Sequence, residues 1–79
     1  MPKFPVVSGK ELIKYLTKYK GFRVNSSSGS HVTMKKLLDT KISTTVPLHD
    51  ELKLGTLRSA LLKAGISDET FIEEWKRYM

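Results

Sequence analysis

The stretch "GFRVNSSSGSHVTMKK", Gly21–Lys36, decides the fold, because apolar and polar residues alternate on both sides of a small, flexible run. Phe22 and Val24 alternate with polar neighbours before the run, and Val32 and Met34 do so after it. Alternation with a period of two is typical of strands that bury one face. The stretch therefore predicts two antiparallel strands joined by the loop "NSSSGS", with an apolar face and a polar face.

Toward the C-terminus, the same reasoning predicts a third strand and two helices. Ile42, Thr44 and Val46 alternate with polar residues until Pro47, which ends the strand. Apolar residues then recur at helical spacing up to Gly65, and Ser67 can cap a final helix. The two apolar stripes consist of Leu57, Ala60, Leu61 and Ala64, and of Phe71, Ile72, Trp75 and Tyr78.

Toward the N-terminus, Ser8 and Glu11 have the spacing of a capping box. A helix is predicted from about Gly9 to Lys20, with Leu12, Tyr15, Leu16 and Tyr19 on one face. The order α-β-β-β-α-α predicts an α+β fold with the helices packed on one face of a three-stranded antiparallel sheet. This order resembles the double-stranded-RNA-binding domain with an added C-terminal helix.

Length and composition limit the kinds of protein that this chain can be. A chain of 79 residues is expected to form one domain, residues 1–79, with a single core and no room for a deeply buried cofactor. It has no cysteine, so disulfides and thiolate metal sites are excluded. Its apolar runs are too short for a membrane span, and no signal peptide is visible. The expectation is a soluble, cytoplasmic protein with no cofactor and no membrane partner.

The charge is strongly positive and unevenly distributed. The formal net charge is +6, and up to Lys36 the only acidic residue is Glu11. A positive N-terminal half favours a polyanionic partner such as nucleic acid, although many small soluble domains are also basic.

On the predicted fold, basic and hydroxyl groups converge at three elements that meet duplex RNA. These elements are the outer face of the first helix, the loop between the first two strands, and the start of the helix after the sheet, where free amides form an anion site. The candidate RNA-binding residues are Lys10, Lys14, Lys18, Ser28, Gly29, Ser30, Lys35, Lys53, Thr56 and Arg58. Gly29 and Ser30 have a simpler explanation, in which they only form a turn.

His31 and His49 are the two histidines of the chain. An imidazole has an unperturbed pKa of about 6.5, so it can take the proton of an RNA 2′-hydroxyl near neutral pH. A lone histidine on a strand, such as His31, is more often a structural or solvent-facing residue than a catalyst. His49 is a possible secondary site residue, but it precedes Asp50 and Glu51, and a hydrogen bond to one of them or to a backbone carbonyl is the simpler role for it. Two histidines without further ligands argue against a metal site.

The segments "PVVSGKELIKYL", "GFRV…GSHVTM" and "TVPLHDELKLGTLRSALLKAGIS" resemble the HicA family of toxins, also called YcfA-like proteins. The resemblance extends from about Pro5 to Ser67. It implies a double-stranded-RNA-binding-like fold, ribosome-independent cleavage of mRNA, and neutralisation by a HicB antitoxin. The catalytic histidine of the family's Gly-Ser-His motif corresponds to His31. Many members have basic residues or glutamine before this motif, whereas this chain has "NSSS".

Three classes of function therefore remain open at the level of sequence. The first is a metal-independent mRNA endonuclease toxin that uses His31 as general acid or base. The second is a non-catalytic module that binds double-stranded RNA through its lysines. The third is an interaction domain whose basic face docks an acidic protein.

Overall fold

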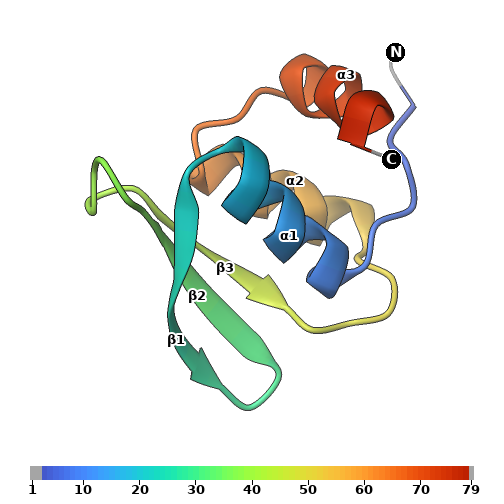
Figure 1. The fold of residues 1–79 in the computed structure, drawn as a ribbon. Helices are drawn as coiled ribbons and strands as arrows, with labels where there is room; N and C mark the ends of the chain where they lie inside the picture. Colours follow the sequence, from blue (N-terminus) through green and yellow to red (C-terminus); the bar gives the residue numbers. More distant parts are fainter. Residues whose placement is uncertain (1–2, 79) are drawn as a thin grey trace.

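The computed structural model describes residues 3–78, and its helices and strands follow the predicted order. The elements are α1 (Gly9–Tyr19), β1 (Phe22–Ser28), β2 (His31–Lys36), β3 (Ser43–Pro47), α2 (Leu54–Lys63) and α3 (Asp68–Tyr78). The strands form an antiparallel sheet in the order β1-β2-β3. Figure 1 shows α1 and α2 side by side on one face of this sheet. The predicted α+β fold is confirmed.

The capping box predicted at the start of α1 is present. The Glu11 amide donates to Ser8 Oγ at 3.1 Å, and the Ser8 amide donates to Glu11 Oε1 at 3.0 Å. Two amides that the first turn leaves without partners are thereby satisfied. Leu12, Tyr15 and Leu16 are buried by the face that the spacing predicted.

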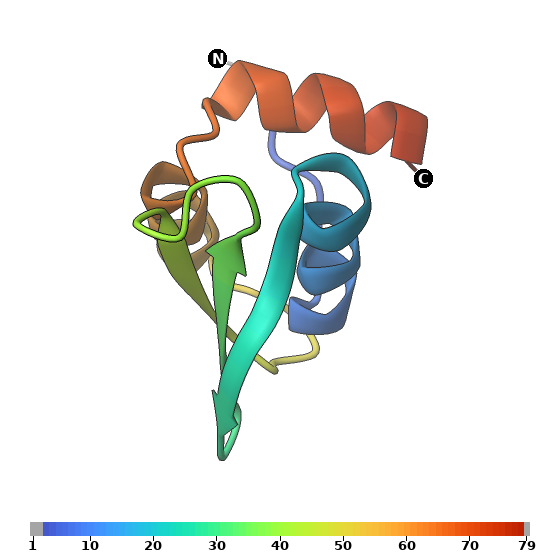
Figure 2. The ribbon, with the colours of Figure 1, turned by 60° about the vertical axis from the view of Figure 1, so that its left-hand side comes forward.

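The predicted loop "NSSSGS" is mostly strand. β1 continues through Ser28, where Ser27 pairs with Val32 and Ser28 pairs with His31. The register shifts between Val24 and Ser26, so Asn25 has no partner across the ladder. Serine has a low strand propensity, but pairing with β2 satisfies the backbone groups of this segment, which decides its conformation. Only Gly29 and Ser30 remain as the turn, at a tip that extends away from α3 (Figure 2).

Val24 corrects a second expectation about the hairpin. It lies opposite Met34, so its side chain is on the predicted face, but it is 51% exposed while Met34 is fully buried. Only Phe22 among the residues of β1 is buried, whereas Thr44, Val46 and Pro47 of the other edge strand, β3, are buried. The apolar face of the sheet therefore belongs mainly to β2 and β3.

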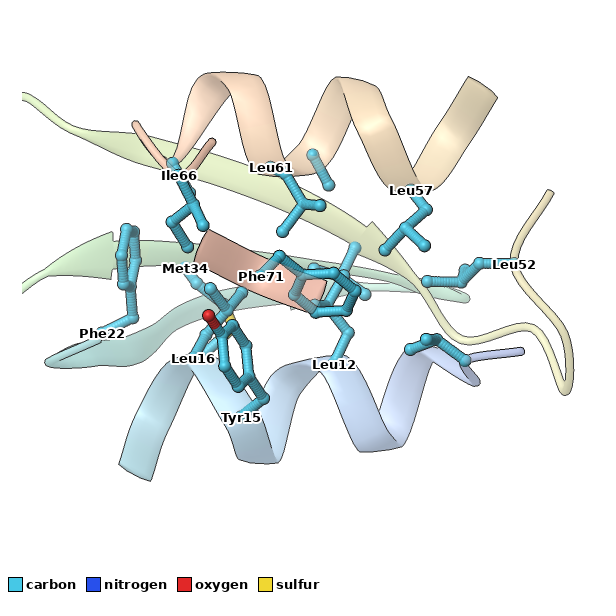
Figure 3. Packing of buried hydrophobic residues seen from close by; sticks show 14 of the residues in the cluster. Leu12, Tyr15, Leu16, Phe22, Met34, Leu52, Leu57, Leu61, Ile66 and Phe71 are labelled. Atoms are coloured by element: carbon cyan, nitrogen blue, oxygen red, sulfur yellow. The ribbon is translucent and has the colours of Figure 1, made fainter. Parts of the chain in front are cut away.

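The core lies between the sheet, α1 and α2, and α3 closes it (Figure 3). Phe71 of α3 is fully buried, and its ring meets the Tyr15 ring edge-on with 5.1 Å between centroids. Ile72 and Trp75 complete the buried face of α3. The last helix is thus part of the core, as its apolar stripe predicted.

A small polar network joins α3 to α1 at the border of the core. The Tyr15 hydroxyl donates to Glu74 Oε1 at 2.7 Å, and Lys20 Nζ lies 2.7 Å from the same oxygen. Lys20, followed by the Tyr15 hydroxyl, lowers the pKa of the Glu74 carboxyl below its usual value. Burial and this hydrogen bond raise the pKa of the Tyr15 phenol well above its ordinary range. The network is therefore strongest when Glu74 is ionised.

Replacing Glu74 by glutamine is expected to lower the free energy of unfolding by about 1 kcal/mol at pH 7, since the charge-assisted bonds are lost. A carboxyl with a depressed pKa stabilises the fold above its unfolded pKa, and that stabilisation is lost as the pH falls through the folded pKa. The difference between Glu74→Gln and wild type should therefore shrink in acid. Urea unfolding at pH 7 and below pH 4 measures it.

Glu73→Gln is the matched control for this prediction. Glu73 forms an exposed pair with Arg77 at 3.4 Å on the same helix, and exposed pairs contribute little. An equal loss of stability in both variants at pH 7 would contradict the role assigned to Glu74.

Candidate active site

His31 is positioned by the turn that precedes it. Gly29 has a φ of 59°, while Ser30 has a negative φ, which is the pattern of a type II′ hairpin turn. Ser28 and His31 are paired as the last residues of the two strands before this turn. The tight turn therefore fixes the backbone of His31 at the beginning of β2.

The end of β3 lies against the same turn. Pro47 pairs with His31 across the sheet, and the Leu48 amide donates to the Ser30 carbonyl at 2.6 Å. This bond extends the pairing one residue beyond β3. The segment that contains His49 consequently begins beside His31.

The N-terminus of α1 holds that segment from its other side. The Gly9 amide donates to the His49 carbonyl at 2.9 Å. A Cβ atom at Gly9 would lie 2.0 Å from the Pro47 carbonyl oxygen and 3.0 Å from Leu48 Cα. Only glycine permits this close approach, so the beginning of α1 sets the position of residues 47–49.

α2 provides the opposite wall. The Thr44 hydroxyl donates to the Ala60 carbonyl at 2.8 Å, which attaches α2 to β3 through a buried hydrogen bond. Lys53 is the N-cap of α2, and in the described structure no side chain caps this helix and its first turn has no acidic residue. The free amides and the partial positive charge of the helix N-terminus therefore remain available to an anion.

Between these elements lies an open groove of about 640 Å³. None of the described residues that line it is acidic, whereas it contains two imidazoles and two lysine side chains. The lining residues are His31, Thr45, Pro47, His49, Lys53, Gly55, Thr56, Ser59, Ala60 and Lys63. A groove of this composition favours an anionic ligand.

Both imidazoles are accessible in this groove. His31 and His49 are exposed, and within residues 3–78 neither ring forms a hydrogen bond or an ion pair. Within residues 3–78 the His49 ring bonds neither to Asp50 or Glu51 nor to a backbone carbonyl, so the simpler structural role is not found there. Both rings are therefore open to contact with a ligand.

The structure brings together four of the residues predicted from the sequence: His31, His49, Lys53 and Thr56. Ser28, Gly29 and Ser30 build the turn next to His31 but do not line the groove. Lys35 lies four residues further along β2 and is partly buried. Lys10, Lys14 and Lys18 are exposed on α1, outside the groove.

Arg58 is directed to a different part of the molecule. It pairs with Asp68 at 3.1 Å, and its guanidinium lies 6.0 Å from the centroid of the Phe4 ring. It lines a separate, largely apolar cavity of about 590 Å³ between the N-terminal segment, α2 and α3. That cavity contains no histidine among its described residues, so the groove is the stronger candidate for chemistry.

Ser59 and Lys63 line the groove but were not among the predicted site residues. They follow Thr56 at helical intervals of three and four, so a polar stripe on α2 was readable. That stripe lies beside the apolar stripe of Leu57 and Leu61, which is the stronger signal in this segment.

No three side chains of the metal-binding types gather closely enough in residues 3–78 to hold an ion. None of the helices in that range combines the length and the apolar character needed to cross a bilayer.

Comparison with known proteins gives one match. A family model described as "HicA toxin of bacterial toxin-antitoxin" matches residues 9–66. This range includes every described residue that lines the groove, whereas α3 lies outside it. No curated protein and no solved structure matches the chain.

Proposed function

Since the chain belongs to the HicA toxin family, we propose that it is the toxin of a HicA/HicB-type toxin–antitoxin system and that it cleaves mRNA without the ribosome. The observation that carries the proposal is the exposed imidazole of His31 in a groove that contains Lys53 and Lys63 and is lined by no acidic residue within the described chain.

His31 is proposed as the general base. In RNA, the 2′-hydroxyl can attack the neighbouring phosphodiester once its proton is removed, and imidazole is the side chain that exchanges protons near neutral pH. The nucleophile thus belongs to the substrate. The reaction forms a 2′,3′-cyclic phosphate and a 5′-hydroxyl end, and it requires no metal ion.

The wall formed by α2 is proposed to bind the phosphate. Negative charge increases on the phosphoryl oxygens as the 2′-oxygen attacks, and preorganised cations and amides stabilise that charge. Lys53, Lys63 and the uncapped N-terminus of α2 supply such groups. The Thr56 and Ser59 hydroxyls can donate further hydrogen bonds.

A non-catalytic role in binding double-stranded RNA is the second candidate. It is favoured by Lys10, Lys14 and Lys18, which are exposed on α1 and form no ion pair within the described residues. Binding by this surface predicts strong salt dependence and no strand scission. The two candidate functions are distinguished by the state of the RNA afterwards, which is cleaved by a nuclease and intact after binding alone.

The family also implies a cognate antitoxin, and we propose a HicB-like protein that covers the groove. Because the groove is basic, an acidic surface on the antitoxin would complement it. Occupation of the groove would exclude RNA, which explains neutralisation without a change in the toxin fold.

The direct test is incubation of the purified protein with a defined mRNA in EDTA. We expect scission, with 2′,3′-cyclic phosphate and 5′-hydroxyl ends. Intact RNA in a reaction where binding is saturated would reject the nuclease and support the binding module. Products that appear only after a divalent metal is restored would reject the proposed chemistry.

A further inference from the structure

We infer that His49 is a second catalytic residue, which gives its proton to the 5′-oxygen that leaves the phosphate, while His31 acts as the base. This inference rests on the proposed function, because it concerns the same cleavage reaction. It follows from the position of the two rings, the charges around them and the bonds that fix their backbones.

Strand pairing puts the two side chains on one side of the backbone. Pro47 is the partner of His31 in the ladder, and residues directly opposite each other have their side chains on the same face. His49 follows Pro47 by two residues, which returns its side chain to that face as long as the backbone stays extended. The presence of Thr45, Pro47 and His49 together in the groove lining agrees with this alternation.

The spacing suits a phosphodiester between the rings. If the pairing continues beyond β3, as the Leu48–Ser30 bond indicates, His31 and His49 are diagonal neighbours with backbones roughly 7–8 Å apart. Two imidazoles at this separation can contact the two sides of a single phosphate. The 2′-oxygen and the 5′-oxygen lie on opposite sides of the phosphorus in an in-line displacement. Each ring can therefore exchange a proton with one of these two oxygens.

The surroundings leave the His49 proton available for transfer. Within the described chain its ring has no carboxylate partner, and the lysines that line the groove with it are Lys53 and Lys63. A ring that is not engaged in a structural hydrogen bond can donate to a ligand without breaking one.

The backbone of His49 is nevertheless held in place. Its carbonyl accepts the Gly9 amide at 2.9 Å, and the preceding residue, Leu48, donates to Ser30 at 2.6 Å. The ring thus projects from a segment that is fixed on both sides. Such fixation is what positions a proton donor against a reacting atom.

The proposed step balances as follows. The 2′-oxygen forms a bond to phosphorus and loses its proton to the free ring nitrogen of His31. The bond between phosphorus and the 5′-oxygen breaks, and its electron pair takes the proton of the His49 imidazolium. The products are a 2′,3′-cyclic phosphate and a 5′-hydroxyl. Exchange with water restores both rings.

The test compares two short RNAs that differ at one cleavable linkage. One has the normal 5′-oxygen at the cleavage site, and the other has a bridging 5′-sulfur, which leaves readily as a thiolate and needs no proton donor. Single-turnover cleavage of both is measured for wild type, His49→Gln and His31→Ala.

We expect His49→Gln to slow cleavage of the oxygen linkage by about 10²–10⁴-fold, the usual contribution of a general acid or base. On the sulfur linkage the same variant should remain within about tenfold of wild type, whereas His31→Ala should be slow on both. Preserved cleavage of the sulfur linkage also demonstrates that His49→Gln is folded and binds RNA.

Two results would overturn the assignment of His49. Equal losses on both linkages would mean that His49 binds or positions the RNA, and no loss on either would leave it without a role. A wild-type protein that cleaves neither linkage would instead reject the proposed nuclease function itself.

Discussion

His31→Ala is expected to reduce RNA cleavage by at least about 10²–10⁴-fold, because it removes the group proposed to take the 2′-hydroxyl proton. The fold should be unaffected. The His31 ring is exposed and has no hydrogen-bond partner within residues 3–78, and changes at such surface positions usually alter stability by less than about 0.5 kcal/mol. Single-turnover cleavage and thermal unfolding of the same preparation measure the two quantities.

His31→Gln serves as the companion variant. Glutamine retains hydrogen-bonding groups of similar reach but cannot transfer a proton near neutral pH. If His31 only binds RNA, glutamine should restore much of the activity, and that result would contradict the catalytic role. Induction of wild type and variants in a bacterial host gives a second readout, since only a nuclease-competent protein should stop growth.

Gly9→Ala is expected to lower the free energy of unfolding by about 2–4 kcal/mol, from overpacking and the loss of a backbone hydrogen bond. The added Cβ would lie 2.0 Å from the Pro47 carbonyl oxygen, and neither backbone can yield without separating α1 from residues 47–49. Because this contact also holds His49, cleavage by the folded fraction should fall as well. Urea unfolding and cleavage at a temperature where the variant is folded check both parts.

Gly55→Ala is the matched control for stability. Gly55 also lies in the first turn of a helix, but nothing lies within 4 Å of a Cβ built there. Alanine is favoured over glycine in helices by up to about 1 kcal/mol, so this variant should be at least as stable as wild type. A Gly9→Ala protein as stable as Gly55→Ala would show that the close approach of α1 does not position the groove.

The parts of the fold that local patterns specify were predictable from the sequence. The capping box at Ser8 and Glu11 and the strand alternation at Val32 and Met34 each depend on residues near in the chain. So does the cap of α3, where the Thr70 amide donates to Ser67 Oγ at 3.2 Å. The exposure of Val24 depends instead on how far the helices extend over the sheet, since Val46 on the other edge strand, β3, is fully buried. That coverage is set by tertiary packing, so alternation alone cannot reveal it.

The kinds of residue in the candidate site could be predicted from the sequence, but only some of the residues that line the groove could be. His31, His49, Lys53 and Thr56 were selected as proton-transfer or anion-binding types, and the groove contains all four. Arg58 follows Thr56 by two residues, which places it on another face of α2, and Asp68 from α3 binds it there. That pairing joins distant segments and leaves no local signal in the sequence.

The contacts of α3 could be predicted only in part from the sequence. The family match ends at residue 66, yet Phe71, Ile72 and Trp75 of α3 are buried in the core. Its amphipathic pattern predicted a packed helix, but the partners of its polar face, Tyr15 and Lys20 on and beside α1, were not readable. The helix is thus integral to the structure although it lies outside the matched range.

The irregular pairing of β1 also bears on how the molecule behaves at high concentration. An exposed sheet edge is a template on which another chain can stack, and small sheet proteins aggregate by that route. Here the edge is interrupted at Asn25 and continues with three serines that present hydroxyls in place of apolar side chains. A neighbouring strand would gain little burial and would meet a kinked ladder, so the hairpin is protected against such stacking.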